Sequence, residues 1–278
     1  MILTNRDKKL LLDLTSYALL TTKVVQARYF QTVAMTTVLR RLRRLEDHSY
    51  IQRIHGLENA QLAWGLAKLG AEQCPEKISK IHFSRSTLDH DLKLMALRLK
   101  LEDYGISKSW RPEHEIRTLV AKRNNQKGLS DRIIPDALMG VENNEFKESV
   151  AIELELSPKN QARYRNIFGE YQQKSSLWGL WYMVGSNSIG RQLEKAAKDA
   201  GFYGRKPFFL WSNLNDVLLD PANAVLKMRD RKYLLKELWE TNPAHTPAQG
   251  MSRENEKINT EENELSAGNE EKTLAPTR

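Results

Sequence analysis

The sequence has little cysteine and no long apolar run, and each shortage excludes a class of protein. Cys74 is the one cysteine among 278 residues, which excludes internal disulfides and cysteine-cluster zinc sites and favours a reducing cytoplasm. No stretch has the length of a membrane span, and residues 1–11 lack the pattern of a signal peptide. No two histidines are separated by three residues, which excludes metal sites built on that spacing. We therefore expect a soluble, cytoplasmic protein with no membrane partner.

Charge is the next feature. The chain is 40% hydrophobic and 28% charged, as is ordinary for a soluble protein, and it is long enough for two small domains plus tails. Its formal net charge is +8. A basic protein without a membrane segment suggests a nucleic-acid partner first, although the same charge also fits a merely soluble surface.

The C-terminal residues 241–278 differ from the rest in composition. They hold seven Glu against four Lys or Arg, so the remainder of the chain carries +11. They also lack aromatic residues and cannot bury enough apolar surface to fold. We expect a disordered acidic tail, and the sequence leaves open whether it binds a partner or keeps the protein soluble.

Residues 1–75 have the pattern of a winged helix-turn-helix domain. Helical periodicity predicts a first helix capped by Thr4 or Asn5, a second after Thr21-Thr22, and a third from Thr36 or Thr37. Segments 50–54 and 61–66 then read as a hairpin. In this fold the third helix enters the major groove and the hairpin lies along the DNA backbone.

The third helix carries a basic face opposite its apolar one. Arginines suit phosphate contact and can also read guanine edges. Alternatively, this face is only solvated or forms a dimer interface. The protein could therefore be a homodimer. We predict DNA contacts from one set of residues on this helix and the following hairpin: Thr37, Arg40, Arg41, Arg43, Arg44 and Arg53.

The pattern of residues 76–215 predicts a domain with a mixed sheet flanked by helices. Together with the helical first domain, this makes the expected fold class of the whole chain α+β. After a connection over 67–84, a helix over 86–104 is followed by a strand within 110–120 and two strands flanking a turn at 142–145. His90 and Asp91 fall in the first turn of that helix, facing either the site or solvent. Further on we expect a helix from Ser157 to about Gln173, a strand at 177–184, a helix at 188–200, a strand at 207–211, and a C-terminal helix within 216–240.

Three carboxylates gather in the centre of this second domain. Asp136 follows a proline at the end of an apolar run, and Glu153 and Glu155 alternate with apolar residues along the next strand. Alternation puts both glutamates on one face, with Asp136 on the hairpin partner. A divalent cation would relieve their repulsion, and oxygen ligands suit Mg²⁺ or Mn²⁺. Alternatively, the glutamates lie on an ordinary solvent-exposed face of the strand. However, unpaired carboxylates in an interior strand destabilise the fold.

Pro135-Asp136 followed by Glu153-x-Glu155 resembles the restriction-endonuclease-like nuclease core, whose signature is PD and then (D/E)-x-K. The resemblance implies that Asp136 and Glu153 hold the metal with a backbone carbonyl, and that a lysine orients the attacking water. Glu155 stands where that lysine is expected. Three interpretations of this departure are open. The chain can be one of the members of the fold that carry E-x-E, or Lys159 or Arg163 can take the role of the missing lysine. Alternatively, the domain is an inactive nuclease core that only binds DNA.

The longer pattern VLRRLRRLEDHSYIQR, W-x-L-x-x-x-G, PDAL, AIELELS and YRNIFGEY is similar to the replication-relaxation family and to MobC-type plasmid mobilisation relaxases. The resemblance covers residues 3–211. It implies nicking of one DNA strand at a transfer origin, with Asp136, Glu153, Glu155 and Lys159 as catalytic residues, the three carboxylates as metal ligands, and other mobilisation or coupling proteins as partners.

Two further questions stay open. A relaxase commonly uses a tyrosine nucleophile. No diagnostic neighbour marks any of the available tyrosines, which are Tyr164, Tyr171, Tyr182 and Tyr203. We therefore take water as the expected nucleophile. The main alternative function is a non-catalytic winged-helix regulator with a degenerate nuclease-like domain. A third is a nuclease that cuts both strands.

Overall fold

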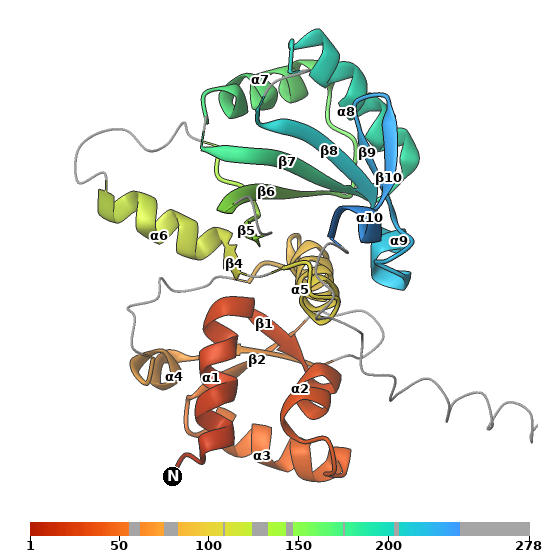
Figure 1. The fold of residues 1–278 in the computed structure, drawn as a ribbon. Helices are drawn as coiled ribbons and strands as arrows, with labels where there is room; N and C mark the ends of the chain where they lie inside the picture. Colours follow the sequence, from red (N-terminus) through yellow and green to blue (C-terminus); the bar gives the residue numbers. More distant parts are fainter. Residues whose placement is uncertain are drawn as a thin grey trace, which may run out of the picture. The chain divides into compact units, whose positions relative to one another are not determined.

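A computed structural model of the chain describes residues 1–55, 62–74, 83–107, 109–123, 133–142, 147–174, 176–202 and 206–239. The expected acidic tail at 241–278 lies outside these residues, as do most of the expected turn at 142–145 and Tyr203. All the described elements belong to one unit, Met1–Thr241 (Figure 1).

The first part of the chain combines helices with a three-stranded antiparallel sheet of order β1-β3-β2. Its elements in chain order are α1 (Asn5–Tyr17), β1 (Leu19–Thr21), α2 (Thr22–Tyr29), α3 (Met35–Asp47), β2 (Ile51–Ile54), β3 (Ala63–Leu66) and α4 (Lys68–Glu72). The three predicted helices and the predicted hairpin are therefore present. Strand β1 was not expected, and the expected connection at 67–84 contains α4.

Local sequence explains where these helices begin. Thr4 caps α1 in a capping box with Asp7, and the Thr21 side chain accepts a hydrogen bond from the backbone N–H of Val24 at the start of α2. The apolar side of α3 is buried through Val38, Leu42 and Leu45. One hydrophobic cluster, here called the N-terminal cluster, collects the buried side chains of this part from Leu10 to Trp64, together with Leu88 and Met95.

The second part is built on a seven-stranded mixed sheet of order β10-β9-β8-β7-β6-β5-β4. Its elements are α5 (Leu88–Asp103), β4 (Ser109–Pro112), α6 (Glu113–Arg123), β5 (Ala137–Glu142), β6 (Lys147–Glu155), α7 (Gln161–Gln172), β7 (Leu177–Val184), α8 (Asn187–Asp199), β8 (Phe208–Asn213), α9 (Leu214–Leu219), β9 (Val225–Met228), β10 (Arg231–Leu234) and α10 (Leu235–Trp239). Strands β6, β7 and β8 are parallel, and β5 pairs with β6 antiparallel as predicted.

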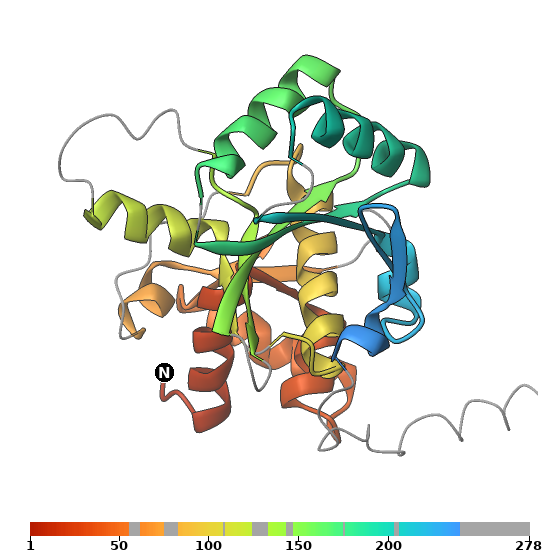
Figure 2. The same ribbon diagram turned by 45° about the horizontal axis from the view of Figure 1, so that its top comes forward.

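The two faces of this sheet are covered by different helices. Val150, Ile152 and Leu154 of β6 pack with residues of α5, α9 and α10. Ala151, between them, packs with α7 and α8 on the opposite face (Figures 1 and 2). The alternation predicted for β6 is therefore confirmed, and it assigns Glu153 and Glu155 to the α7 side.

Helix α5 contributes to two hydrophobic clusters. Leu88 and Met95 are buried in the N-terminal cluster, whereas Leu97 and Leu101 are buried against the large sheet. The helix thus joins the two parts of the chain through its opposite sides.

One predicted strand is a helix. The segment 110–120 contains only the end of the short β4 and then α6, because Pro112 ends the strand and two acidic residues, Glu113 and Glu115, favour the positive end of a helix. A side-chain ion pair between Glu113 and Arg117, one turn apart, adds to that preference.

The predicted C-terminal helix within 216–240 is also wrong. Asp220 Oδ1 accepts hydrogen bonds from the backbone N–H groups of Ala222 and Asn223, which makes a turn rather than a helix start. The chain after it forms the β9–β10 hairpin. Similarly, α7 begins at Gln161 with Asn160 as its cap, not at Ser157-Pro158.

Candidate functional site

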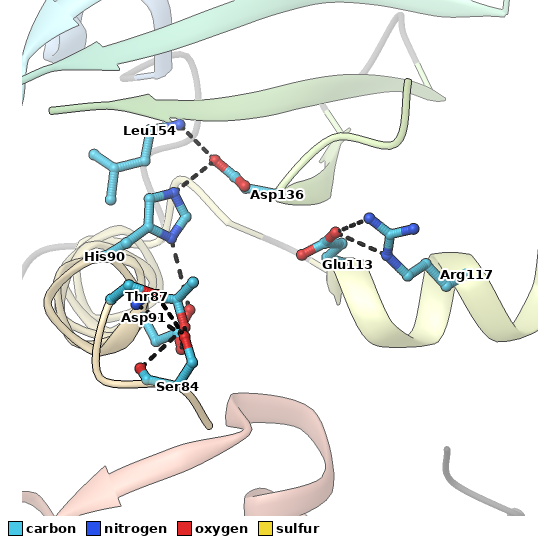
Figure 3. Close-up of polar contacts among 9 residues, drawn as sticks. Ser84, Thr87, His90, Asp91, Glu113, Arg117, Asp136 and Leu154 are labelled. Atoms are coloured by element: carbon cyan, nitrogen blue, oxygen red, sulfur yellow. Dashed lines mark hydrogen bonds and ion pairs between the residues drawn. The ribbon is translucent and has the colours of Figure 1, made fainter. Parts of the chain in front are cut away.

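The candidate site lies where β5 begins and β6 ends. Asp136 precedes the first residue of β5, and the register that pairs Ala137 with Ile152 brings Asp136 beside Glu153. The Oδ2 atom of Asp136 accepts two hydrogen bonds, from the backbone N–H of Leu154 at 2.7 Å and from His90 Nε2 at 3.1 Å (Figure 3). Asp136 is thus fixed by both the sheet and α5.

Glu153 is the most perturbed carboxylate of this site. Burial and the negative charge of Asp136 raise its pKa to about 8, although the hydroxyl of Tyr171 donates a hydrogen bond to Glu153 Oε1. Burial disfavours the charged form of a carboxylate, and a neighbouring carboxylate disfavours it further. The protein therefore holds Glu153 in a position where a cation would be favourable.

Glu155 has a different partner. It is only 3% exposed, and its carboxylate forms an ion pair with the ammonium group of Lys159. Burial raises the pKa of Glu155 while Lys159 opposes that rise. The backbone N–H of Lys159 donates to the hydroxyl of Tyr164 at 2.9 Å, which fixes the segment between β6 and α7. A lysine thus reaches the E-x-E motif from four residues further along the chain.

The predicted site residues are therefore neighbours, but they do not form a ready metal cage. Among the described residues, no three His, Cys, Asp or Glu side chains are grouped so that they could hold a metal ion. Glu153 supplies the unbalanced negative charge, whereas Asp136 is paired with His90 and Glu155 with Lys159.

The basic face of α3 is only partly free. Thr37, Arg40, Arg43 and Arg44 are exposed. In contrast, the guanidinium group of Arg41 binds the buried carboxylate of Asp7 and the backbone oxygen of Ile2. Arg53 pairs with Glu46 at 2.8 Å and lies over the Trp64 ring. Arg41 and Arg53 thus have contacts within the protein that their sequence positions did not indicate.

Two residues beside the carboxylates were not selected from the sequence. The sequence left His90 undecided between the site and solvent, and the structure brings its imidazole to Asp136. Tyr171 was weighed as a nucleophile and not as a partner of the carboxylates; it is fully buried, and its hydroxyl binds Glu153. Helical spacing gives the side on which such residues lie, but it does not identify the strand that they meet.

A family model described as Replication-relaxation matches residues 11–179. The chain belongs to the replication-relaxation family. The match ends within β7, so α8 and the later elements of this replication-relaxation protein lie outside it. No curated protein is similar enough to count as a match.

Two solved structures are similar at a low level. They are titled as the restriction endonuclease FokI, at 12% identity, and FokI bound to DNA, at 11%, each with a TM-score of 0.29. Each similarity covers 79% of this chain and 46% of that chain. In the part of the chain that the structure describes, no helix is both long and apolar enough to cross a membrane.

Proposed function

We propose that this replication-relaxation protein binds double-stranded DNA at a transfer origin and nicks one strand there in a metal-dependent reaction. The observation that carries the proposal is the pair Asp136 and Glu153, two carboxylates brought together by the pairing of β5 with β6, of which Glu153 is half-buried and has a raised pKa. A site of this kind is more often chemical than structural, because an uncompensated buried carboxylate is destabilising.

DNA recognition is assigned to the exposed side of α3. The order α1, β1, α2, α3, β2, β3 is the order of a winged helix-turn-helix domain, in which the third helix enters the major groove. Four side chains on α3 are free to contact DNA: Thr37, Arg40, Arg43 and Arg44. Arg41 and Arg53 are assigned to holding the domain together.

The residues of the site fit a divalent cation. Asp136 and Glu153 would hold it through carboxylate oxygens, which are the ligands that Mg²⁺ and Mn²⁺ prefer. The cation would supply a bound water of lowered pKa and would balance charge that develops on the phosphate. In our assignment Glu155 is not a ligand. It holds the ammonium group of Lys159, which would take the role of the lysine in the (D/E)-x-K motif.

Water is the proposed nucleophile. Tyr164, Tyr171 and Tyr182 are buried, and burial raises the pKa of each hydroxyl, so none is poised to attack a phosphate. Lys159 is 30% exposed and can turn from Glu155 toward a bound phosphate. It would then stabilise negative charge at the scissile group.

A plasmid relaxation assay tests the proposal. Supercoiled plasmid carrying the element's transfer region would be incubated with protein and Mg²⁺, Mn²⁺ or EDTA, beside Asp136→Ala and the exposed control Asp216→Ala. Open-circle product that requires metal and Asp136 supports nicking, whereas linear product would indicate cleavage of both strands.

One observation favours a second candidate, a DNA-binding regulator without activity. Lys159 neutralises Glu155, so the E-x-E motif presents one uncompensated glutamate rather than two. Under this reading the plasmid stays supercoiled in every metal while binding to its transfer region persists.

A further inference from the structure

His90 connects the N-terminal half of the chain to the candidate site. It lies in the first turn of α5, and its Nε2 atom is 3.1 Å from Asp136 Oδ2. The same oxygen already accepts the N–H of Leu154 at 2.7 Å. Both hydrogen bonds therefore end on Oδ2, which leaves Oδ1 as the oxygen of Asp136 that can turn to a cation.

The first turn of α5 is itself held in place. The backbone N–H of Asp91 donates to Thr87 O at 2.9 Å, and Thr87 N–H donates to the Ser84 hydroxyl at 3.3 Å (Figure 3). Leu88 is buried in the N-terminal cluster. The other ring nitrogen of His90 lies 3.6 Å from the carboxylate of Asp91. The imidazole thus extends from a fixed turn and cannot easily follow Asp136 if that carboxylate rotates.

We propose that His90 is a positioning residue of the nicking site, which fixes Asp136 through Oδ2 so that Oδ1 is presented to the divalent cation. The inference rests on the function proposed above and adds a residue to it. Partners that orient a metal-binding side chain commonly contribute 10–100-fold to metal affinity. His90 acts through Asp136 and is not itself assigned as a ligand.

The alternative is that the contact only joins α5 to the sheet. In that case loss of the imidazole lowers stability but leaves the affinity for metal unchanged. The two roles are separated by a measurement of metal binding that needs neither DNA nor turnover.

The test is calorimetric titration of the full-length protein with Mn²⁺, with nicking rates measured in parallel. His90→Ala should weaken Mn²⁺ binding about tenfold, within the range for orienting partners. His90→Gln, whose side-chain amide can still donate to Asp136, should recover most of that affinity. The nicking rate of His90→Ala should approach that of the wild type at saturating Mn²⁺.

His114→Ala is the matched control. This histidine lies on α6, and its Nε2 atom bonds the backbone oxygen of Thr15 at 2.7 Å rather than a site carboxylate. It should bind Mn²⁺ like the wild type even if it is less stable. If His90→Ala fails to fold, His90→Leu removes the hydrogen bond while retaining volume.

The outcomes separate the two proposals. Unchanged Mn²⁺ affinity in His90→Ala, or equal loss in His90→Ala and His90→Gln, overturns the positioning role and leaves nicking intact. If the wild type binds Mn²⁺ but does not nick, and His90→Ala binds Mn²⁺ more weakly, the positioning role is supported and the proposed function is overturned. A wild type that binds no Mn²⁺ overturns both.

Discussion

Two carboxylates of this chain, the buried Asp7 at the start of α1 and the half-buried Glu153 on β6, have opposite surroundings. Asp7 is 1% exposed and is compensated by Arg41 and by the backbone and hydroxyl of Thr4, so its pKa is lowered despite burial. Glu153 lies beside another carboxylate, and burial and that charge raise its pKa to about 8. Burial alone therefore does not indicate a functional acid. The balance of charge around it is the useful signal.

The largest expected effect separates activity from stability at Glu153. Glu153→Gln should reduce nicking by about 100- to 1000-fold, as expected for loss of a group that acts in the transition state. Its free energy of unfolding should be unchanged or higher, because glutamine replaces a carboxyl group whose charged form is favoured in the unfolded chain and disfavoured in the folded protein. Plasmid relaxation and urea unfolding measure the two quantities. A less stable variant with normal nicking would contradict the contrast.

Asp7→Asn should show the reverse pattern. Removing this charge leaves Arg41 without its partner and weakens the capping box, which should lower the free energy of unfolding by about 2–3 kcal/mol. The expected loss is smaller than for a fully buried pair because the Arg41 side chain is 20% exposed. Urea unfolding beside the exposed control Asp47→Asn measures the effect. Equal midpoints for the two variants would argue against it.

The arginines of α3 allow the same comparison. Replacing both Arg43 and Arg44 with Ala should weaken DNA binding and reduce the slope of log K against log salt by about 0.9 per charge. Stability should change little, because both side chains are exposed. Arg41→Ala should instead lower the unfolding midpoint. A salt titration of fluorescence anisotropy provides the slopes, and an unchanged slope for the double variant would remove α3 from the DNA interface.

The smallest expected effect is the pH dependence of the Asp7 contact. The pKa of Asp7 is lowered in the folded state, so its contribution is complete above the unfolded-state pKa, about 4. It is lost as pH falls through the folded-state pKa. The difference in unfolding free energy between wild type and Asp7→Asn should therefore shrink on acidification. Urea unfolding at pH 6 and at successively lower pH checks this, and a constant difference would contradict it.

Sequence periodicity was sufficient for the α3 helix and for the alternation of β6, because each depends on burial of one side of a single element. It failed for α6, where apolar and polar residues alternate locally but Pro112 and the following acidic residues favour a helix. It also failed for the β9–β10 hairpin, whose turn depends on hydrogen bonds made by Asp220.

The candidate site was predictable only in part. Asp136, Glu153 and Glu155 follow from motif spacing and strand alternation. The contact of His90 with Asp136 depends on how α5 packs against the sheet, and the pairing of Arg41 with Asp7 depends on how α3 meets α1. Such contacts join residues 34 or more positions apart in the sequence and leave no local pattern.

The shared packing of α5 limits how this protein can be recombined. A graft that exchanges residues 1–75 for the equivalent segment of a relative would keep Leu88 and Met95 while replacing the cluster in which they are buried. The grafted cluster would have to pack against the unchanged α5, and any displacement of α5 would move His90. Retargeting by exchange of modules should therefore take α5 together with the N-terminal segment, with the crossover placed after Gly105.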